Sequence, residues 1–242
     1  MADDDVPDKE AFYHDAQSYW EKVPSTVEGV MGGFGRLSHQ DIKCSKEFLL
    51  PFIQGPGATV KTSRALDCGA GIGRVSKLLL LPLFSEVDLE EQNPAFLEKA
   101  RVYLKAETVA HVKNYYAVGL QDFTPPEAWY DVIWVQWVMA HLTDEDFVSF
   151  LRRATAALTP NGLIVVKENI AKDEDIFEED DSSITRCMQS FHRLFSMADL
   201  RIVKQENQTK FPQEMYQITM FALQPTKSAV HTTNLSDVSI SV

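Results

Sequence analysis

A glycine-rich stretch at residues 65–75, ALDCGAGIGRV, has the features of a strand end, a tight turn and a helix start. Gly69, Gly71 and Gly73 alternate in it, and glycine lets a backbone turn sharply and lets a ligand approach where a Cβ would otherwise stand. The apolar residues within 74–83 predict a helix that lies on a sheet. Together these features indicate a nucleotide-type binding loop, although the glycines alone would also fit a plain tight turn.

The spacing of the glycines indicates which class of ligand the loop binds. G-x-G-x-G differs from the G-x-G-x-x-G that places a pyrophosphate on a helix N-terminus, which weakens the alternative of an NAD-dependent oxidoreductase. Asp67, directly before the first glycine, would place a carboxylate where a dinucleotide presents phosphate. S-adenosylmethionine suits this loop better, because its adenosine carries no phosphate and its methionine end carries an ammonium and a sulfonium. We therefore expect S-adenosylmethionine as the cofactor.

A second acidic position follows the next expected strand. Residues 87–91, VDLEE, form a short alternating segment that ends in two acids. In doubly wound folds a carboxylate at this point can accept hydrogen bonds from both ribose hydroxyls. We assign this role to Glu91, with Glu90 as the alternate.

The carboxyl ends of the parallel strands should form the rest of the site, because ligands of such sheets bind there. The residues expected at this rim are Gly69, Gly71, Glu91, Leu120, Gln121, Gln136, Trp137, His141, Glu168 and Asn169. Methyl transfer from a sulfonium is an in-line displacement and needs an aligned, unprotonated nucleophile. An α-amine has a pKa of about 8, so a base or a desolvating site must take its proton. His141 titrates in the useful range, and a purely structural role is its alternative.

Asn169 offers a carboxamide oxygen to an N–H of such an amine. The chain then enters residues 173–181, DEDIFEEDD, which hold seven acids in nine positions. Most of these acids should be solvated, but two could bind a positively charged substrate, because this loop leaves the strand that delivers Asn169. Trp137 could pack on a substrate ring or shield the methyl path, with core packing as the alternative.

Composition limits the class of protein. The 242 residues are 45% hydrophobic, which suffices for one α/β domain with a sizeable core. The net charge of −12 disfavours direct nucleic-acid binding and favours cationic partners. We expect no membrane span and no signal peptide, and a soluble protein of the nucleus and cytoplasm. Three cysteines without a C-x-x-C pair predict neither a disulfide framework nor a metal site.

Alternating helix and strand patterns predict how these residues are positioned. Helices are expected over 10–22, 38–52, 74–83, 94–107, 144–158 and 182–197, and strands before the glycine loop and over 87–91, 112–118, 130–138, 163–167, 200–203 and 215–223. This alternation predicts an α/β fold with a parallel sheet and right-handed crossovers, whose last two strands form a hairpin at one edge.

We expect one domain over residues 9–223, with disordered segments at 1–8 and 224–242. Residues 9–55 should form N-terminal helices and a segment that closes over substrate, since 29–35 contain four glycines, although a plain linker would also fit. The first helix carries an aromatic stripe, for which packing is the ordinary role. Trp20, in this stripe, is a candidate substrate contact.

Several of these stretches resemble the protein α-N-terminal methyltransferases. The resemblance is carried by DCGAGIGR at 67–74, GLQDFTP at 119–125, YDVIWVQW at 130–137, HLTD at 141–144 and FLRR at 150–153, within similarity from about residue 12 to residue 223. Members of this family act on X-Pro-Lys or X-Pro-Arg N-termini once the initiator methionine is removed. The resemblance implies a Rossmann-like, seven-stranded S-adenosylmethionine-dependent methyltransferase fold with an N-terminal helical extension.

The resemblance also implies roles for individual residues. The implied cofactor contacts are Gly69, Arg74, Gln121 and Gln136, and the implied peptide contacts are Met31, Phe34, Leu37, Trp137, Asn169, Glu178, Asp181, Ser183 and Tyr216. His141 and Asp181 match the residues proposed in the family to orient and deprotonate the terminal amine. A slot of Met31, Leu37 and Trp137 would take proline in second position, and Glu178 would pair with the following Lys or Arg.

Two departures from the family pattern lengthen an acid. Glu91 and Glu178 stand where the family usually has aspartate, and neither change reverses a charge, so we expect activity with altered affinities. Two alternatives are a methyltransferase for small molecules or nucleic acid and a catalytically weak peptide-binding module of the same fold. A DNA amine methyltransferase would carry Asn/Asp-Pro-Pro-Tyr/Phe after the fourth strand, where this chain has Gln136-Trp137-Val138.

Overall fold

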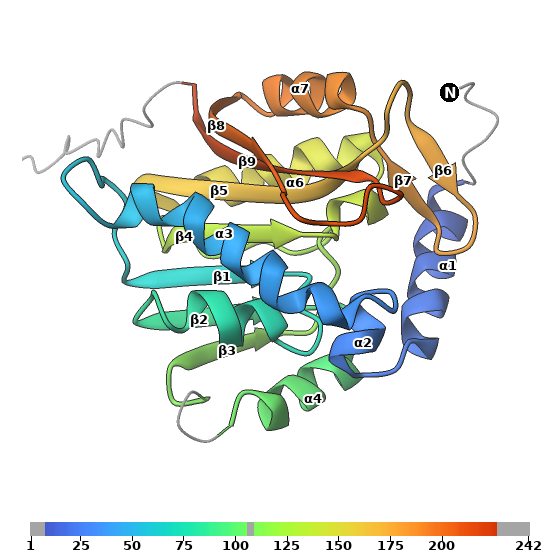
Figure 1. Ribbon diagram of the computed structural model, residues 1–242, viewed down its shortest axis with the longest axis horizontal. Helices are drawn as coiled ribbons and strands as arrows, with labels where there is room; N and C mark the ends of the chain where they lie inside the picture. The colour runs from blue at the N-terminus through green and yellow to red at the C-terminus, as the bar shows by residue number, and fades with distance from the viewer. Residues whose placement is uncertain (1–7, 106–108, 227–242) are drawn as a thin grey trace, which may run out of the picture.

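The computed structural model describes residues 8–105 and 109–226 (Figure 1). Disorder was expected at residues 1–8 and 224–242, of which 1–7 and 227–242 lie outside the described residues. Asp8 is ordered as the cap of α1, so the expectation is wrong there. The last strand runs to Pro225, two residues beyond the expected end of the domain. The domain boundaries themselves stay a prediction.

The core of the protein is a seven-stranded sheet in the order β3-β2-β1-β4-β5-β9-β8. Its strands are β1 (Arg64–Cys68), β2 (Glu86–Glu90), β3 (Val112–Tyr116), β4 (Tyr130–Gln136), β5 (Leu158–Ile170), β8 (Leu200–Asn207) and β9 (Gln217–Pro225). The first five are parallel, and β9 is antiparallel to both of its neighbours. The predicted α/β fold and edge hairpin are confirmed. The strand order reverses between β1 and β4, which is the ligand-binding switch point of such sheets.

Helices cover both faces of the sheet (Figure 1). The helices are α1 (Lys9–Lys22), α2 (Val27–Val30), α3 (Ser38–Ile53), α4 (Pro94–Tyr103), α6 (Asp144–Ala156) and α7 (Met188–Met197). One apolar cluster joins α6 and α7 to one face, and a second joins α3 and α4 to the other. Strand β4 contributes Ile133 and Val135 to the first cluster and Val132 and Trp134 to the second, so it is buried on both faces as predicted.

Three helix predictions need correction. The helix expected over 74–83 contains a wider π turn at Ser76–Leu80, and Pro82, which has no N–H, cannot extend it. The helix expected to reach 107 ends at Tyr103. The helix expected from 182 begins only at Met188.

The acidic segment contains a two-stranded sheet rather than only a solvated loop. Strands β6 (Ile176–Glu178) and β7 (Ser183–Thr185) pair antiparallel. The hairpin forms because Ile184 is buried and Phe177 packs on the ring of Phe12 from α1. Contacts with a distant helix, which are not visible in the local charge pattern, therefore decide the structure of this segment.

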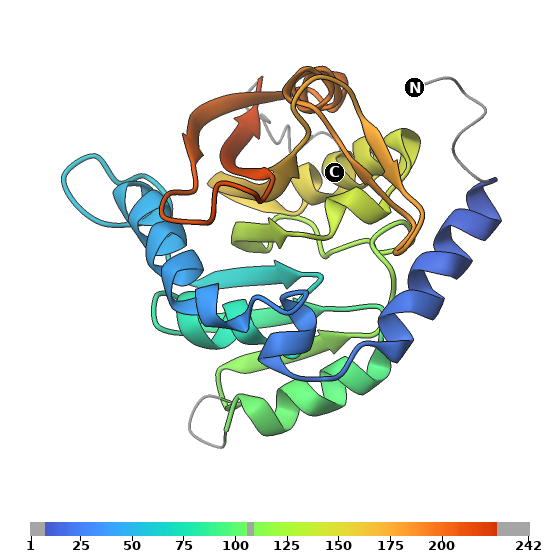
Figure 2. The same cartoon turned by 45° about the vertical axis from the view of Figure 1, so that its right-hand side comes forward.

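Helix α1 runs along the side of the molecule where the parallel strands end (Figure 2). The hydroxyl of Tyr13 donates a hydrogen bond to Asp146 of α6 at 2.5 Å, and Lys9 forms an ion pair with the same carboxylate at 2.8 Å. The hydroxyl of Ser182 donates to the Phe12 carbonyl at 3.0 Å. These bonds hold α1 across the carboxyl ends of the strands.

A buried carboxylate joins α3 to the sheet. Asp41 accepts hydrogen bonds from Lys167 Nζ at 2.5 Å, Arg74 Nη1 at 2.7 Å and Gln136 Nε2 at 3.0 Å, and its side chain has no exposed surface. Although burial alone would raise the pKa of Asp41, the two cations lower it and keep the carboxyl ionised.

Removal of this carboxylate would leave Arg74 and Lys167 as unpaired buried cations. We expect Asp41→Ala to lower the free energy of unfolding by about 3–5 kcal/mol, measured by urea denaturation. Glu47→Ala on the same helix removes an exposed pair, Lys43–Glu47 at 3.9 Å, and should cost less than about 1 kcal/mol. Equal losses in the two variants would contradict a central role for Asp41.

Candidate active site

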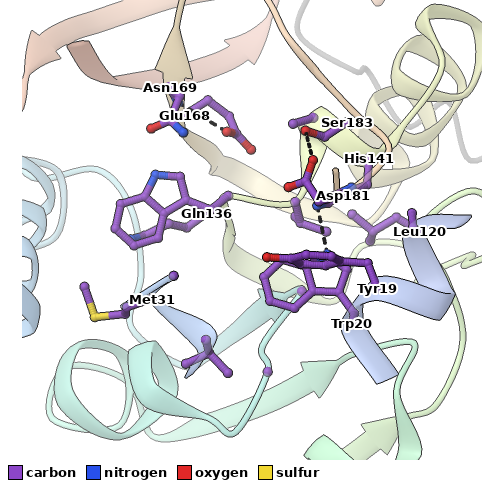
Figure 3. A pocket seen from close by; sticks show the side chains of 18 of the residues that line it. Tyr19, Trp20, Met31, Leu120, Gln136, His141, Glu168, Asn169, Asp181 and Ser183 are labelled. Atoms are coloured by element: carbon purple, nitrogen blue, oxygen red, sulfur yellow. Dashed lines mark hydrogen bonds between the residues drawn. The ribbon is translucent and has the colours of Figure 1, made fainter. Parts of the chain in front are cut away.

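A cavity of about 660 Å³ lies at the carboxyl ends of the parallel strands (Figure 3). The predicted site residues that line it are Trp20, Met31, Phe34, Gly69, Gly71, Arg74, Glu91, Leu120, Gln121, Gln136, Trp137, His141, Asn169, Glu178, Asp181, Ser183 and Tyr216. Leu37, the residue directly before α3, is not among the residues that line this cavity, and the substrate contact expected of it stays a prediction. The hairpin residues Met215 and Ile218, which the sequence did not single out, line the cavity as well.

Gly69 and Gly71 are glycine for different physical reasons. Gly69 has φ +62°, and a Cβ there would lie 2.6 Å from Cβ of Val138, so the protein's own packing excludes a side chain. Gly71 has φ +55°, and a Cβ there would meet only Val30, at 3.4 Å. The loop therefore leaves open space at Gly71, which suits a ligand that approaches the backbone closely.

The acids near this loop are bound to backbone N–H groups. Glu90 accepts from Gly69 N at 3.0 Å, and Glu91 accepts from Gly71 N at 2.9 Å and from Asn93 N at 2.8 Å. Burial raises the pKa of both carboxyls. Both line the cavity, so both remain candidates for the ribose, and each carboxylate oxygen has a lone pair left for a hydroxyl.

Asp67 lines the cavity, and its carboxylate is also bound to the helix that follows the glycine loop. Its carboxylate accepts hydrogen bonds from N and Oγ of Ser76, at 2.9 and 2.6 Å, at the start of the following helix. Burial raises its pKa to about 6. Asp67 thus contributes charge to the cavity wall while its hydrogen bonds hold the helix.

The charges of the cavity fit S-adenosylmethionine. Among the described residues, the cavity is lined by one arginine, Arg74, and by eight carboxyl side chains: Asp67, Glu90, Glu91, Glu168, Glu178, Asp180, Asp181 and Glu214. The carboxyls suit a ligand with an ammonium and a sulfonium. The hydrogen bonds described for Arg74 all use Nη1, so Nη2 and Nε can bind a carboxylate.

His141 is held by two neutral partners. Its Nε2 lies 3.0 Å from Nε1 of Trp20, and its Nδ1 lies 3.3 Å from the carbonyl oxygen of Ser182. Burial lowers the pKa of the imidazole, against the opposing charge of Asp181. The ring is therefore neutral in the free protein.

The acidic mouth of the cavity consists of Glu178, Asp180, Asp181 and Glu214. Oδ1 of Asp181 accepts a hydrogen bond from Oγ of Ser183 at 2.7 Å, which orients the carboxylate. Glu178 accepts from the hydroxyl of Tyr216 at 2.8 Å, so the β6–β7 hairpin and the β8–β9 loop meet across the opening. Figure 3 shows Asn169 and Asp181 on the side of the cavity opposite Met31.

Trp137 carries two marks of a functional position. Its φ of +55° is unusual for a bulky residue and costs roughly 1–3 kcal/mol. Its indole N–H is buried and, within the described part of the chain, has no hydrogen-bond partner. An unsatisfied buried donor costs about 1–3 kcal/mol, so a ligand with an acceptor at this point would relieve it.

Glu168 has no predicted role beyond its place at the rim. It is buried directly before Asn169 and accepts from Met139 N at 2.9 Å, which fixes the turn that carries His141. Burial raises its pKa from 4.5 to about 7. Its position at the end of a buried strand was the only sequence signal for it.

The raised pKa of Glu168 makes stability depend on pH. The folded state prefers the neutral form of Glu168. The resulting contribution to the free energy of unfolding is fully present below pH 4.5 and is lost as the pH rises through about 7. The contribution is about 3 kcal/mol. We expect Glu168→Gln to lose less free energy of unfolding than the wild type between pH 5 and pH 8, measured by urea denaturation. The exposed Glu174→Gln should keep the wild-type slope. A wild-type slope in Glu168→Gln would show that another group carries the effect.

No described helix is long and apolar enough to cross a membrane, and no cluster of three or more His, Cys, Asp or Glu in the described ranges could hold a metal ion.

Comparisons with known proteins agree with this geometry. The chain is 50% identical to N-terminal Xaa-Pro-Lys N-methyltransferase 1 of Danio rerio and 46% identical to that of Homo sapiens, in each case over 92% of this chain and all of the relative. A solved S-adenosylmethionine-dependent methyltransferase of Leishmania major is 39% identical, with a TM-score of 0.82 over 88% of this chain and 83% of that one. Residues 8–224 match the family model described as AdoMet dependent proline di-methyltransferase. The chain therefore belongs to this family and is an S-adenosylmethionine-dependent methyltransferase.

Proposed function

We propose that this enzyme methylates the α-amino group of proteins whose exposed N-terminus reads X-Pro-Lys or X-Pro-Arg. The observation that carries the proposal is a single cavity that joins a glycine loop at one end to the acidic mouth at the other. The names of its relatives of 45–50% identity support the same reaction. A location in the nucleus and cytoplasm, as expected in the sequence analysis, is part of this proposal.

The residues between the two ends of the cavity suit a terminal amine. When bound, S-adenosylmethionine supplies an electrophilic methyl group on a sulfonium. Asn169 would accept an amine N–H with its carboxamide oxygen, and Asp181, with Oδ1 bound to Ser183, offers Oδ2 to the same nitrogen. His141 and Asp181, which both line this part of the cavity, are the two groups that could orient the amine and remove its proton. The carboxyl-lined wall gathers the cationic substrate.

The peptide beyond the amine would extend through the acidic mouth. Met31 and Trp137 provide apolar surface for a proline, and the unpartnered indole N–H of Trp137 suits a peptide carbonyl. Glu178, held by Tyr216, lies where a Lys or Arg in third position would pair with it.

The reaction is tested on a pair of peptides. A peptide that starts Ser-Pro-Lys should gain mass in methyl steps with S-adenosylmethionine, because its α-amine can lose a proton. An N-acetylated copy should gain none. Mass spectrometry distinguishes the two results, and equal labelling of both peptides would refute methylation of the terminal amine.

The acidic mouth is tested by charge reversal. Glu178→Lys should raise the KM for a Ser-Pro-Lys peptide about tenfold or more, because it opposes the third-residue cation. Glu179→Lys makes the same change at the next residue, which is exposed and does not line the cavity, and should have a smaller effect. Steady-state kinetics at varied peptide concentration give both values. Matching KM values for the two variants would mean that the lysine binds elsewhere.

A further inference from the structure

The hydrogen bond between Trp20 and His141 determines which nitrogen of the imidazole carries the proton. An indole N–H can only donate, so Nε2 of His141 must be the acceptor of the 3.0 Å bond. A neutral imidazole has one N–H, which is then on Nδ1 and donates to the carbonyl oxygen of Ser182. His141 is thus the Nδ1–H tautomer, and its single ring lone pair is already occupied.

The turn at residues 139–142 is held in place, so His141 cannot readily move to another hydrogen-bond partner. Arg186 donates to the carbonyls of Met139 and Leu142, at 3.0 and 2.6 Å, and Glu168 accepts from Met139 N. The ring of Trp20 lies edge-on to that of His141, with 5.7 Å between the ring centroids. If Nε2 of His141 were protonated, its N–H would face the indole N–H of Trp20. The hydrogen bond from Trp20 therefore disfavours protonation of Nε2.

The titratable groups near His141 come from several elements, and Asp181 is the one whose charge acts on the ring directly. Arg186 and Glu168 of β5 bond the backbone of the turn that carries the ring, and Asp144 of α6 binds Arg186. Asp146 of α6 and the neutral phenol Tyr13 of α1 bond Thr143, directly after the turn. Asp144 is paired with Arg186, and Asp146 with Lys9 and Tyr13. Glu168 uses both of its oxygens, Oε1 for Met139 N and Oε2 for Asn169 N. Of these carboxylates, Asp181 is therefore the one with an oxygen left for the cavity, since its described bond uses Oδ1 alone.

We propose that Trp20 is a positioning residue that keeps His141 neutral as the Nδ1–H tautomer, so that His141 holds the Ser182 carbonyl and does not serve as the base. The proton of the substrate ammonium then passes to Oδ2 of Asp181: an N–H bond breaks, an O–H bond forms, and the lone pair remains on nitrogen. This step rests on the proposed function, whereas the state of the ring does not. Through Trp20, the proposal gives α1 a chemical role in addition to its packing.

The state of the ring is tested on the full chain without substrate. Long-range ¹H–¹⁵N correlation spectra of histidine-labelled protein, with His141 assigned from the His141→Asn spectrum, should show protonated Nδ1 and unprotonated Nε2 at pH 7. In Trp20→Phe the lone pair is free and Asp181 favours the imidazolium, so the pKa of His141 should rise by about one unit or more. Trp129→Phe makes the same change at an exposed tryptophan and should leave the His141 signals unchanged.

Kinetics separate positioning from base catalysis. His141→Asn keeps an N–H donor near the Nδ1 position and has no basic nitrogen. If His141 positions Ser182, this variant should retain most of the single-turnover methylation rate, while His141→Ala should lose much more. If His141 is the base, both variants should lose the roughly 100- to 10,000-fold that general-base catalysis contributes.

The outcomes are distinguishable from failure of the proposed function. A wild type that does not methylate the Ser-Pro-Lys peptide overturns that function and leaves the tautomer result intact. An active wild type whose His141 is protonated at Nε2 at pH 7, or whose His141 pKa is the same in Trp20→Phe, overturns the role of Trp20. Equal losses in His141→Asn and His141→Ala overturn the assignment of the proton to Asp181 alone.

Discussion

Asp41 is the electrostatic centre on which the site depends. It binds Arg74 beside the glycine loop, Gln136 at the end of β4 and Lys167 in β5, although it belongs to a helix outside the sheet. Arg74 is the one arginine that lines the cavity among the described residues, and Asp41 fixes its Nη1 at 2.7 Å. The docking of α3 therefore also positions the cation that can bind a carboxylate of the cofactor.

The rest of the cavity has the opposite bias. Burial raises the pKa of Asp67, Glu90, Glu91 and Glu168, so the free protein confines acids that would ionise more readily in water. A bound cationic ligand would offset the free-energy cost of ionising these buried carboxyls. The site is therefore less favourable empty than filled, which is typical of functional sites that are organised before the ligand arrives.

Much of this architecture could be predicted because it follows local rules. The glycine loop, the strand ends and the cap of α4 by Asn93 depend on short sequence patterns, and they place most of the predicted residues around one cavity. The β6–β7 hairpin was missed because it depends on a contact between distant segments, since Phe177 packs on Phe12 of α1.

Other features carried no sequence signal for their partners. The pairing of Asp41 with Lys167 joins residues 126 positions apart, and the bond from Trp20 to His141 joins residues 121 apart. A stripe of aromatics predicts packing, and nothing in its spacing indicates that one indole N–H meets an imidazole.

The position of β9 has a consequence for synthesis of the protein. This strand, the last of the described strands along the chain, lies between β5 and β8 in the sheet, and the loop before it supplies Tyr216 and Met215 to the cavity. Helix α1 is the first described element to be synthesised, and its packing partner Phe177 is synthesised much later, in the β6–β7 hairpin. A nascent chain therefore lacks a complete site until β9 and the loop before it have emerged and joined the sheet.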